Sequence, residues 1–319
     1  MNQPASADAS TQSEAEPLSE VAKKIQGRSP WQLAFERLRN DRVAVCSAIV
    51  IVLIALMAIL APVVALVTGH DPNVQFRTTG LSPAGIPVGP NGSFWLGTDD
   101  LGRDVLVRIF FGARISLLAG VVASLISVSV GVLVGLVAGY FGGWVDTVLS
   151  RFMDVVLSLP YLVFAIALVS VVGPSLTITI GVISFFSFSS VGRIVRGQVL
   201  SAKEKEYVEA ARSLGAGNAR IMFVDVLPNV LAPVIVYATL LVPLSIVFEA
   251  TLSFLGLGVV PPTASWGGML SESIQFYQVA WWFVAFPGLA LLVTTLAFNL
   301  LGDSVRDAFD PRYNRLFNN

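Results

Sequence analysis

The chain has very few of the residues that build catalytic or metal sites. Its 319 residues include one histidine, His70, and one cysteine, Cys46, which lies inside an apolar run. A single cysteine excludes an intrachain disulfide and a thiolate metal cluster. A single imidazole argues against a histidine zinc site and against a nucleophile activated by histidine elsewhere in the chain. We therefore expect no catalytic, cofactor or metal site in this chain.

Charge is also scarce. Only 13% of the residues are charged, whereas soluble domains carry about one-quarter charged residues. The formal net charge of -1 leaves no basic face for neutralising phosphates, so we expect no nucleic-acid partner. By contrast, 55% of the residues are hydrophobic. This composition predicts an all-α integral membrane protein that contacts lipid.

Long apolar runs define the expected membrane crossings. A hydrocarbon core of about 30 Å is spanned by ~20 helical residues. Six stretches meet this requirement, namely residues 43–67, 115–139, 155–172, 175–191, 230–248 and 279–301. The fourth is the shortest of the six. Six crossings place both termini on the same side of the membrane.

Basic residues predict which side that is. Sixteen of the 20 Lys and Arg residues fall in the two terminal segments or in the loops that share their side. The other side receives Arg77, Arg103 and Arg108, while Arg114 lies at a membrane boundary. Cytoplasmic loops carry the excess of Lys and Arg, so we expect both termini in the cytoplasm.

The terminal segments differ from the spans. Residues 1–28 are rich in Ser, Ala, Gln, Glu and Pro and predict a disordered cytoplasmic tail. Residues 29–42 predict an interfacial amphipathic helix with Ser29 as N-cap and Pro30 in its first turn. Its apolar stripe comprises Trp31, Ala34, Phe35 and Leu38, opposite Arg37 and Arg39. The alternative is a solvated lead-in to the first span, and residues 303–319 predict a cytoplasmic C-terminal tail.

Three glycines recur at intervals of four in the second predicted span. Gly131, Gly135 and Gly139 therefore share one helix face that carries no side chains. Such a face allows another helix to approach closely. We expect helix packing here, and a groove that lines the substrate path is the alternative.

Two acidic residues lie in or near predicted spans. Asp154 and Glu249 both fall close to span ends. Burial of charge in a membrane is costly and often functional. We expect local pairing or snorkelling, with Arg151 as the partner of Asp154, and a direct role in transport is the alternative.

Two loops on the outer side, residues 68–111 and 249–278, are too long for simple turns. The first contains Asp99, Asp100 and Asp104, but their spacing does not match a calcium-binding EF-hand loop. The second is punctuated by Gly and Pro around Trp266 and Leu270, which we expect at an exposed rim, as a docking surface or a re-entrant turn.

The polar stretch around residues 200–229 separates the fourth and fifth spans and falls on the cytoplasmic side. Ser201 and Glu204 predict a capping box, and Gly215 predicts the end of a helix of about three turns. Tyr207, Ala210, Ala211 and Leu214 form a small apolar stripe along it. A second short helix is expected over residues 219–226, with Pro228 in the first turn of the fifth span.

The motif "EAARSLGAGNARIMFVDVLP" in this stretch resembles the EAA loop of bacterial ATP-binding-cassette (ABC) importer permeases. The matching residues are Glu209, Ala210, Ala211, Gly215, Leu227 and Pro228. "LGTDDLGRDVLVRIFFGARISL", "TLSFLGLGVVPPTASWGGML" and "NLLGDSVRDAFDPR" resemble the C-type permease subunits of dipeptide, oligopeptide and nickel uptake systems. The resemblance runs from Trp31 to Arg312. Asp225 departs from the pattern, because the broader family favours an apolar residue there and the peptide branch often a histidine.

The resemblance implies a type I ABC importer permease fold in a bacterial plasma membrane, with residues 43–302 as a six-span permease domain. Its cytoplasmic helix would dock on an ATPase subunit through Tyr207, Glu209, Ala210, Ala211, Leu214, Gly215, Leu227 and Pro228. Two cytoplasmic ATPase domains would bind ATP and magnesium, since this chain has no G-x-x-x-x-G-K-[ST] motif. A second permease would complete the pathway, and an extracytoplasmic binding protein would dock near Phe94, Trp95 and Trp266.

Several alternatives stay open at this stage. Within the family, peptides are the expected substrate, and nickel, glutathione, haem and oligosaccharide are alternatives. A secondary transporter would require buried charges and inverted repeats, which the sequence does not display convincingly. A membrane enzyme would require catalytic groups clustered at one depth, whereas the acids here are scattered among loops.

Overall fold

The structure, a computed structural model, describes residues 30–309, which are mostly helical. Within this range no strand forms, and only two isolated β-bridges occur, both in the loop before α5. The elements are α2 (Pro30–Asn40), α3 (Arg42–Ile59), α4 (Ala61–Thr68), α5 (Val105–Phe141), α6 (Gly143–Ser158), α7 (Tyr161–Val172), α8 (Leu176–Ala202), α9 (Glu206–Ser213), α10 (Asn218–Arg220), the π-helix η1 (Ile221–Val226), α11 (Leu227–Phe254), α12 (Trp266–Ser273), the 3₁₀-helix η2 (Ile274–Phe276) and α13 (Trp281–Phe309). The predictions for residues 1–28, Ser29 and residues 310–319 lie outside the described range.

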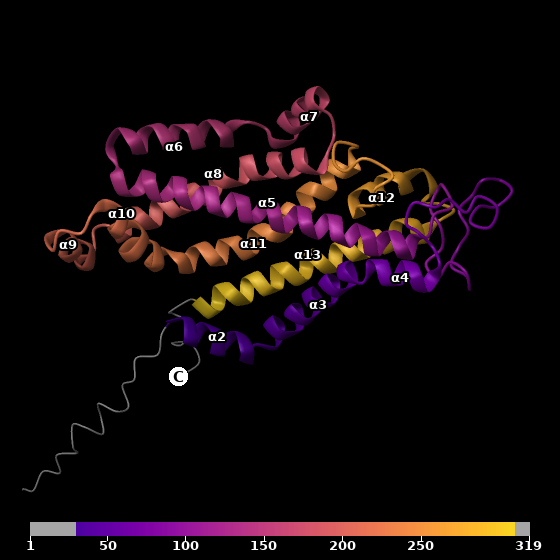
Figure 1. The fold of residues 1–319 in the computed structure, drawn as a ribbon, viewed down its shortest axis with the longest axis horizontal. Coiled ribbons are helices and arrows are strands. Elements are labelled where there is room, and N and C mark those ends of the chain that lie inside the picture. The colour runs from indigo at the N-terminus through magenta and orange to yellow at the C-terminus, as the bar shows by residue number, and fades with distance from the viewer. Residues whose placement is uncertain (1–29, 310–319) are drawn as a thin grey trace, which may run out of the picture.

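The helices run roughly along one long axis, so the molecule has two distinct ends (Figure 1). α9 and α10 lie at one end, with α2 and the end of α13 nearby. The irregular loop of residues 69–104 lies at the other end, beside α4 and α12 (Figure 1). This arrangement separates the predicted coupling segment from the predicted outer loops.

Five helices of the described range are long and apolar enough to cross a membrane: α3, α5, α8, the continuous helix Asn218–Phe254, and α13. α6 and α7 make a sixth crossing if this pair of helices, bent by 85° at its junction, is counted as one broken span. A straight span over residues 155–172 was therefore a wrong prediction. Pro160 explains the break, because a residue before proline is pushed out of the helical region and Leu159 has φ -77° and ψ 131°.

Several helices extend beyond the apolar runs that predicted them. α5 begins at Val105 because the Asp104 carboxylate accepts hydrogen bonds from the backbone N–H groups of Leu106 and Val107. α8 continues to Ala202, and α13 continues to Phe309, past the predicted start of the C-terminal tail. Apolar runs mark the lipid-facing part of a helix, whereas hydrogen bonding determines where the helix ends.

The helix α2 packs against the end of α13. The rings of Trp31 and Phe309 meet edge to face at 5.2 Å between centroids, and Arg37 Nη1 donates to the carbonyl oxygen of Ala308 at 3.0 Å. Ala34 is buried, while Phe35 remains 70% exposed. The predicted helix is therefore present, and it is held to the bundle rather than standing alone.

The glycine face of α5 packs directly on α8, as predicted. A Cβ at Gly135 would lie 2.4 Å from the carbonyl oxygen of Gly192, and one at Gly131 would lie 2.5 Å from the Cβ of Val191. A Cβ at Gly139 would lie 2.8 Å from that of Val199. No side chain fits at these positions unless the two helices separate. The face is a helix-packing seam and leaves no groove between α5 and α8.

Candidate functional site

The helix α9 has eight residues, shorter than the predicted three turns. The predicted capping box was wrong, because Ser201 still belongs to α8 and its hydroxyl faces the carbonyl oxygen of Gly197 at 3.4 Å. The end of α9 follows the prediction. Gly215 has φ +80°, its N–H donates to the carbonyl of Arg212, and the Ala216 N–H donates to the carbonyl of Ala211. This pair of bonds is a Schellman motif, which ends the helix with its last carbonyls satisfied.

The two faces of α9 have different roles. Val208 is fully buried and packs in an apolar cluster with Ile221, and Ala211 lies half-buried against the same cluster. On the opposite face, Tyr207 is 40% exposed and Leu214 is 88% exposed. The predicted stripe is therefore divided: Ala211 turns inward, whereas Tyr207, Ala210 and Leu214 are exposed. Glu209, the other predicted coupling residue of α9, is exposed as well.

Val208 was not predicted, although its spacing of three from Ala211 is the signal that would have identified the inward face. Of the remaining predicted coupling residues, Leu227 lies half-buried beside the apolar cluster and Pro228 is exposed. Thus the outer face of α9 is free to meet a partner, while its inner face is fixed to the permease.

The segment after α9 is not a separate short helix, contrary to prediction. α10, η1 and α11 form one continuous helix, and Leu227 N–H donates to the carbonyl of Met222, five residues back. Pro228 lies in the first turn of α11, as predicted. Because proline has no N–H and its ring clashes with the carbonyl four residues earlier, a π-helical stretch directly before it relieves the conflict without breaking the helix.

Asp225 lies within this π-helical stretch, near the outward face of α9. Its Oδ2 atom is buried and has no hydrogen-bond partner in the described range. Partial burial, followed by the Asp225 charge, raises the pKa of Tyr207 above its usual value. Asp225 therefore belongs to the surroundings of α9, although the structure does not show a specific bond for its carboxylate.

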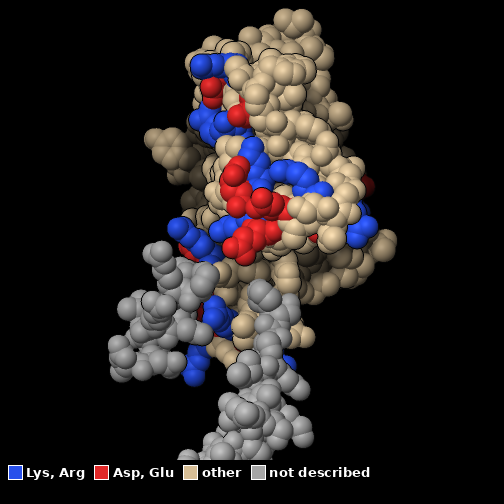
Figure 2. Space-filling model, turned by 90° about the vertical axis from the view of Figure 1, so that its left-hand side faces the viewer, with Lys and Arg blue, Asp and Glu red and all other residues tan. Residues whose placement is uncertain are grey.

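The base of this loop is tied to the end of α5. Lys203 Nζ donates to the carbonyl oxygen of Gly139 at 3.0 Å, and the Tyr140 hydroxyl donates to Asn218 Oδ1 at 3.0 Å. A cation at the carboxyl end of a helix also interacts favourably with the helix dipole. α9 is thereby held between α8, α5 and the start of α11. At this end of the molecule, Lys and Arg gather with acidic side chains between them (Figure 2).

Two ion pairs join α6 to α8 on the same side. Asp154 lies 2.6 Å from Arg193 Nη2 and 3.8 Å from the predicted partner Arg151, so the nearer partner is Arg193. Asp146 accepts two hydrogen bonds from Arg196, through Nε and Nη2. A bidentate arginine–carboxylate pair is geometrically specific. These contacts connect the segment before the Pro160 bend to α8.

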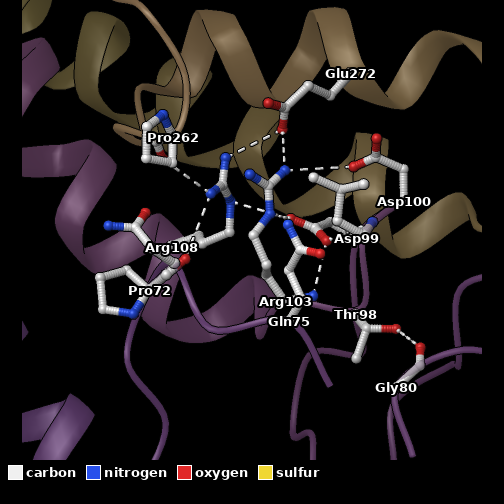
Figure 3. A network of polar contacts seen from close by, with 12 residues as sticks. Pro72, Gln75, Gly80, Thr98, Asp99, Asp100, Arg103, Arg108, Pro262 and Glu272 are labelled. Atoms are coloured by element: carbon white, nitrogen blue, oxygen red, sulfur yellow. Dashed lines mark hydrogen bonds and ion pairs between the residues drawn. The ribbon is translucent and has the colours of Figure 1, made fainter. Parts of the chain in front are cut away.

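At the opposite end, two buried arginines hold the outer loop to α12 (Figure 3). Arg103 Nε donates to Asp99 at 2.5 Å, and Arg103 Nη2 donates to Glu272 at 2.9 Å. Arg108 Nη2 also donates to Glu272, at 3.1 Å. Both arginines are at most 2% exposed. We name Asp99, Asp100, Arg103, Arg108 and Glu272 the outer ion-pair network; it was not predicted.

This network accounts for the acidic cluster that the loop presents. Asp99, Asp100 and Glu272 lie close enough together to surround a metal ion. Their oxygens already face the guanidinium groups of Arg103 and Arg108. Burial, together with the charges of Asp99 and Glu272, raises the pKa of Asp100 to about 6. We therefore interpret the cluster as a structural ion-pair network.

The three aromatic residues predicted for docking differ in how far they are exposed to solvent. Phe94 is only 2% exposed and stacks on His70, with 4.9 Å between ring centroids. Trp266 is fully buried, and its Nε1 donates to the carbonyl of Ile109 at 3.1 Å. The predicted exposure of Trp266 was wrong, because Gly112 leaves room for its ring inside the bundle. Phe94 likewise offers almost no surface for the predicted docking. Trp95, at 60% exposed, remains at the surface.

Glu249 was predicted to pair with a nearby cation or to snorkel to the membrane surface. In the described part of the chain it has no cationic partner, and it lies inside the bundle. It is fully buried, accepts a hydrogen bond from the Ser116 hydroxyl at 2.9 Å, and contacts the Ser253 hydroxyl at 2.7 Å. Ser116 lies on α5 and Ser253 on α11. Glu249 therefore joins α5 to α11 through hydroxyl groups inside the bundle.

Comparisons with known proteins agree with this architecture. Residues 131–315 match the family model described as "Binding-protein-dependent transport system inner membrane component". Residues 29–83 match the "N-terminal TM domain of oligopeptide transport permease C". The chain belongs to this family of binding-protein-dependent transport permeases. It is a multi-pass membrane protein, and its predicted likeness to C-type permease subunits is confirmed.

Individual relatives cover nearly the whole chain. The oligopeptide transport system permease protein of Escherichia coli K12 is 46% identical over 91% of this chain and 93% of its own length. A dipeptide transport system permease protein of Alkalihalophilus pseudofirmus is 42% identical over 89% of this chain and 90% of its own. Such identity over about nine-tenths of both chains indicates one common architecture.

One solved structure supports the fold. A chain from inward-facing conformations of the MetNI methionine ABC transporter aligns with a TM-score of 0.52 at 17% identity, covering 62% of this chain and 94% of that one. At this identity the likeness concerns the fold alone. The predicted all-α, type I importer permease fold is thus confirmed.

Proposed function

We propose that this chain is a membrane-spanning subunit of an ATP-driven importer of dipeptides or oligopeptides, and that α9 couples it to a cytoplasmic ATPase. One observation carries the coupling role: α9 presents Tyr207, Ala210 and Leu214 outward from a base that is fixed to three long helices. A rigid, anchored helix transmits displacement, whereas a loose loop would absorb it.

The proposed complex contains a second, homologous permease and two ATPase domains that bind ATP and magnesium. An extracytoplasmic binding protein would deliver the peptide to the outer end, where Trp95 is exposed. The peptide assignment is supported by relatives that are named as dipeptide and oligopeptide permeases. Both termini and α9 would face the cytoplasm of a bacterial cell, in agreement with the distribution of basic residues.

The coupling role is tested by changing the outward face of α9 in the reconstituted complex. We expect Leu214→Glu and Ala210→Trp to abolish ATP-driven uptake, because each change disrupts apolar contact with a partner surface. Both positions are exposed, so membrane insertion and thermal stability should remain unchanged. Uptake, ATP hydrolysis and ATPase retention on the purified permease are measured together.

Leu214→Met and Ala210→Ser are the matched controls, since they retain the size and character of the surface, and both should transport normally. Full ATP-dependent uptake by the Leu214→Glu, Ala210→Trp double variant would remove the coupling role from α9. Ala211→Trp is a poorer test, because Ala211 packs inward and its replacement would disturb the loop itself.

A further inference from the structure

An apolar groove runs between α3 and α13 near the α2 end of the molecule. It has a volume of about 370 Å³ and is lined almost wholly by hydrocarbon, from Arg42 at its mouth to Val50 and Val293 at its inner end. At 1.5 Å rise per residue, the α3 side of the groove is about 12 Å long. The adjoining surface of α3 exposes Val45 and Ile49, as expected of a lipid-facing helix. The shape suits a hydrocarbon chain that lies along the helices.

A polar hollow adjoins the mouth of this groove. It has a volume of about 340 Å³ and shares Val43 and Leu300 with the groove, so the two form one amphipathic depression. Its lining includes three acidic residues, Asp41, Asp303 and Asp307, and one basic residue, Arg37, whose Nη1 donates to the carbonyl oxygen of Ala308. Asp303 and Asp307 are exposed, lie one helical turn apart on α13, and form no ion pair within residues 30–309.

The charged groups follow one another in a definite order from the mouth of the apolar groove into the polar hollow. Asp41 is already engaged, because its carboxylate caps α3 through the N–H of Val43 and accepts a hydrogen bond from Ser304. Arg42 supplies a positive charge at the end of the apolar groove, and it too has no ion-pair partner in the described range. A ligand that fits would carry, in sequence, a hydrocarbon chain, a negative group and a positive group.

We propose that this depression binds a zwitterionic phospholipid with a primary amine, phosphatidylethanolamine. One acyl chain lies between α3 and α13, the phosphate meets Arg42, and the ammonium group meets Asp303 and Asp307. A phosphatidylglycerol headgroup has no ammonium group, so it would place only uncharged hydroxyl groups beside Asp303 and Asp307. The site therefore discriminates between the two lipids by charge order.

Competition between the two lipids tests the site. The purified complex is reconstituted in vesicles of equal phosphatidylethanolamine and phosphatidylglycerol, and lipids retained on the released complex are measured by native mass spectrometry. We expect the complex to retain about three times as much phosphatidylethanolamine as phosphatidylglycerol, because this is the preference that one exposed ion pair provides. Asp303→Asn with Asp307→Asn should abolish this preference. Arg42→Gln should reduce retention of both lipids, and Ala297→Phe should fill the groove and remove both.

Matched controls separate the site from general effects. Glu204→Gln removes an exposed acid elsewhere on the same side, and Ile49→Phe places the same aromatic side chain on α3 outside the groove lining; neither should change retention. A photoactivatable phosphatidylethanolamine should label residues 42–50 and 293–300. Equal retention of the two lipids by the wild type would overturn the proposal. So would capture of another polypeptide by a photocrosslinking residue at Leu296, because a protein would then occupy the groove.

Discussion

At the scale of single residues, the outer ion-pair network carries a large desolvation cost. Arg103 and Arg108 are almost completely withdrawn from solvent, and desolvation of a guanidinium is costly unless it is fully paired. Asp99 and Glu272 provide that pairing from the loop and from α12. Loss of one partner leaves a buried charge uncompensated, so the network fixes α12 to the outer loop.

Asp100 is the member whose charge is least well compensated, and its pKa of about 6 makes the stability of this region depend on pH. Because the folded state retains a proton that the unfolded chain releases near pH 4, the stabilising contribution is complete at low pH and is lost as the pH rises through 6. We predict that Asp100→Asn raises the Tm of the purified complex by about 1–3 °C at pH 7.5.

The difference between Asp100→Asn and wild type should shrink toward zero near pH 4, where both side chains are neutral. Thermal scans monitored by tryptophan fluorescence measure this profile. Asp71→Asn is the matched control, because Asp71 lies in the same loop, is exposed and is outside the network. A Tm difference that stays constant between pH 4 and pH 7.5 would contradict the assigned titration.

At the scale of elements, the α5–α8 seam is a contact that tolerates little change. We predict that Gly135→Val costs at least 1–3 kcal/mol of stability, roughly the range for overpacking a tight core, because the new side chain meets backbone that cannot move aside. The measurement is the Tm and the yield of monodisperse complex. Gly181→Val is the control, since Gly181 lies on α8 with nothing within 4 Å of its Cβ position. Equal effects of both changes would argue against a specific seam.

Local sequence patterns predicted those elements that depend on local geometry. Gly215 was expected in a left-handed conformation and has one, and the glycine face of α5 was expected to pack on a helix and does. The bend at Pro160 was missed, because the apolar run continues through it and periodicity does not register a single proline. Its signal was the proline itself, which restricts Leu159.

Contacts between distant segments were not predictable in the same way. Trp266 looked like a rim residue because its neighbours are Gly and Pro, yet Gly112, far away in the sequence, provides the space that buries it. Arg103 and Arg108 were predicted to lie on the outer side of the membrane, but no ion-pair partner was predicted for them. Five charged residues within positions 99–108 of a charge-poor chain were the available signal, but their partner Glu272 is set by tertiary structure.

At the scale of the whole molecule, α5 and the α10–α11 helix connect the two ends. α5 carries Arg108 in the outer network and Gly139 beside Lys203 at the base of α9. The other helix begins at Asn218, bonded to Tyr140, and carries Glu249 near its far end, bonded to Ser116. Near each end, the two helices are therefore joined to each other by a hydrogen bond. A displacement of α9 would reach the outer end through rigid helices rather than through loops.

This coupling requires the two ends to lie on opposite sides of the membrane, and paired cysteines test that arrangement. Gly92 and Gly217 are both exposed, and neither has an atom within 4 Å of its Cβ position. In a Cys46→Ser background, Gly92→Cys should react with a membrane-impermeant maleimide in intact spheroplasts, whereas Gly217→Cys should react only after permeabilisation. A cysteine at the neighbouring Asn91 would remove a side chain that accepts hydrogen bonds from the backbone N–H groups of Ser93 and Phe94, which is why Gly92 is chosen. The reverse labelling pattern would place α9 outside, where it could not meet an ATPase.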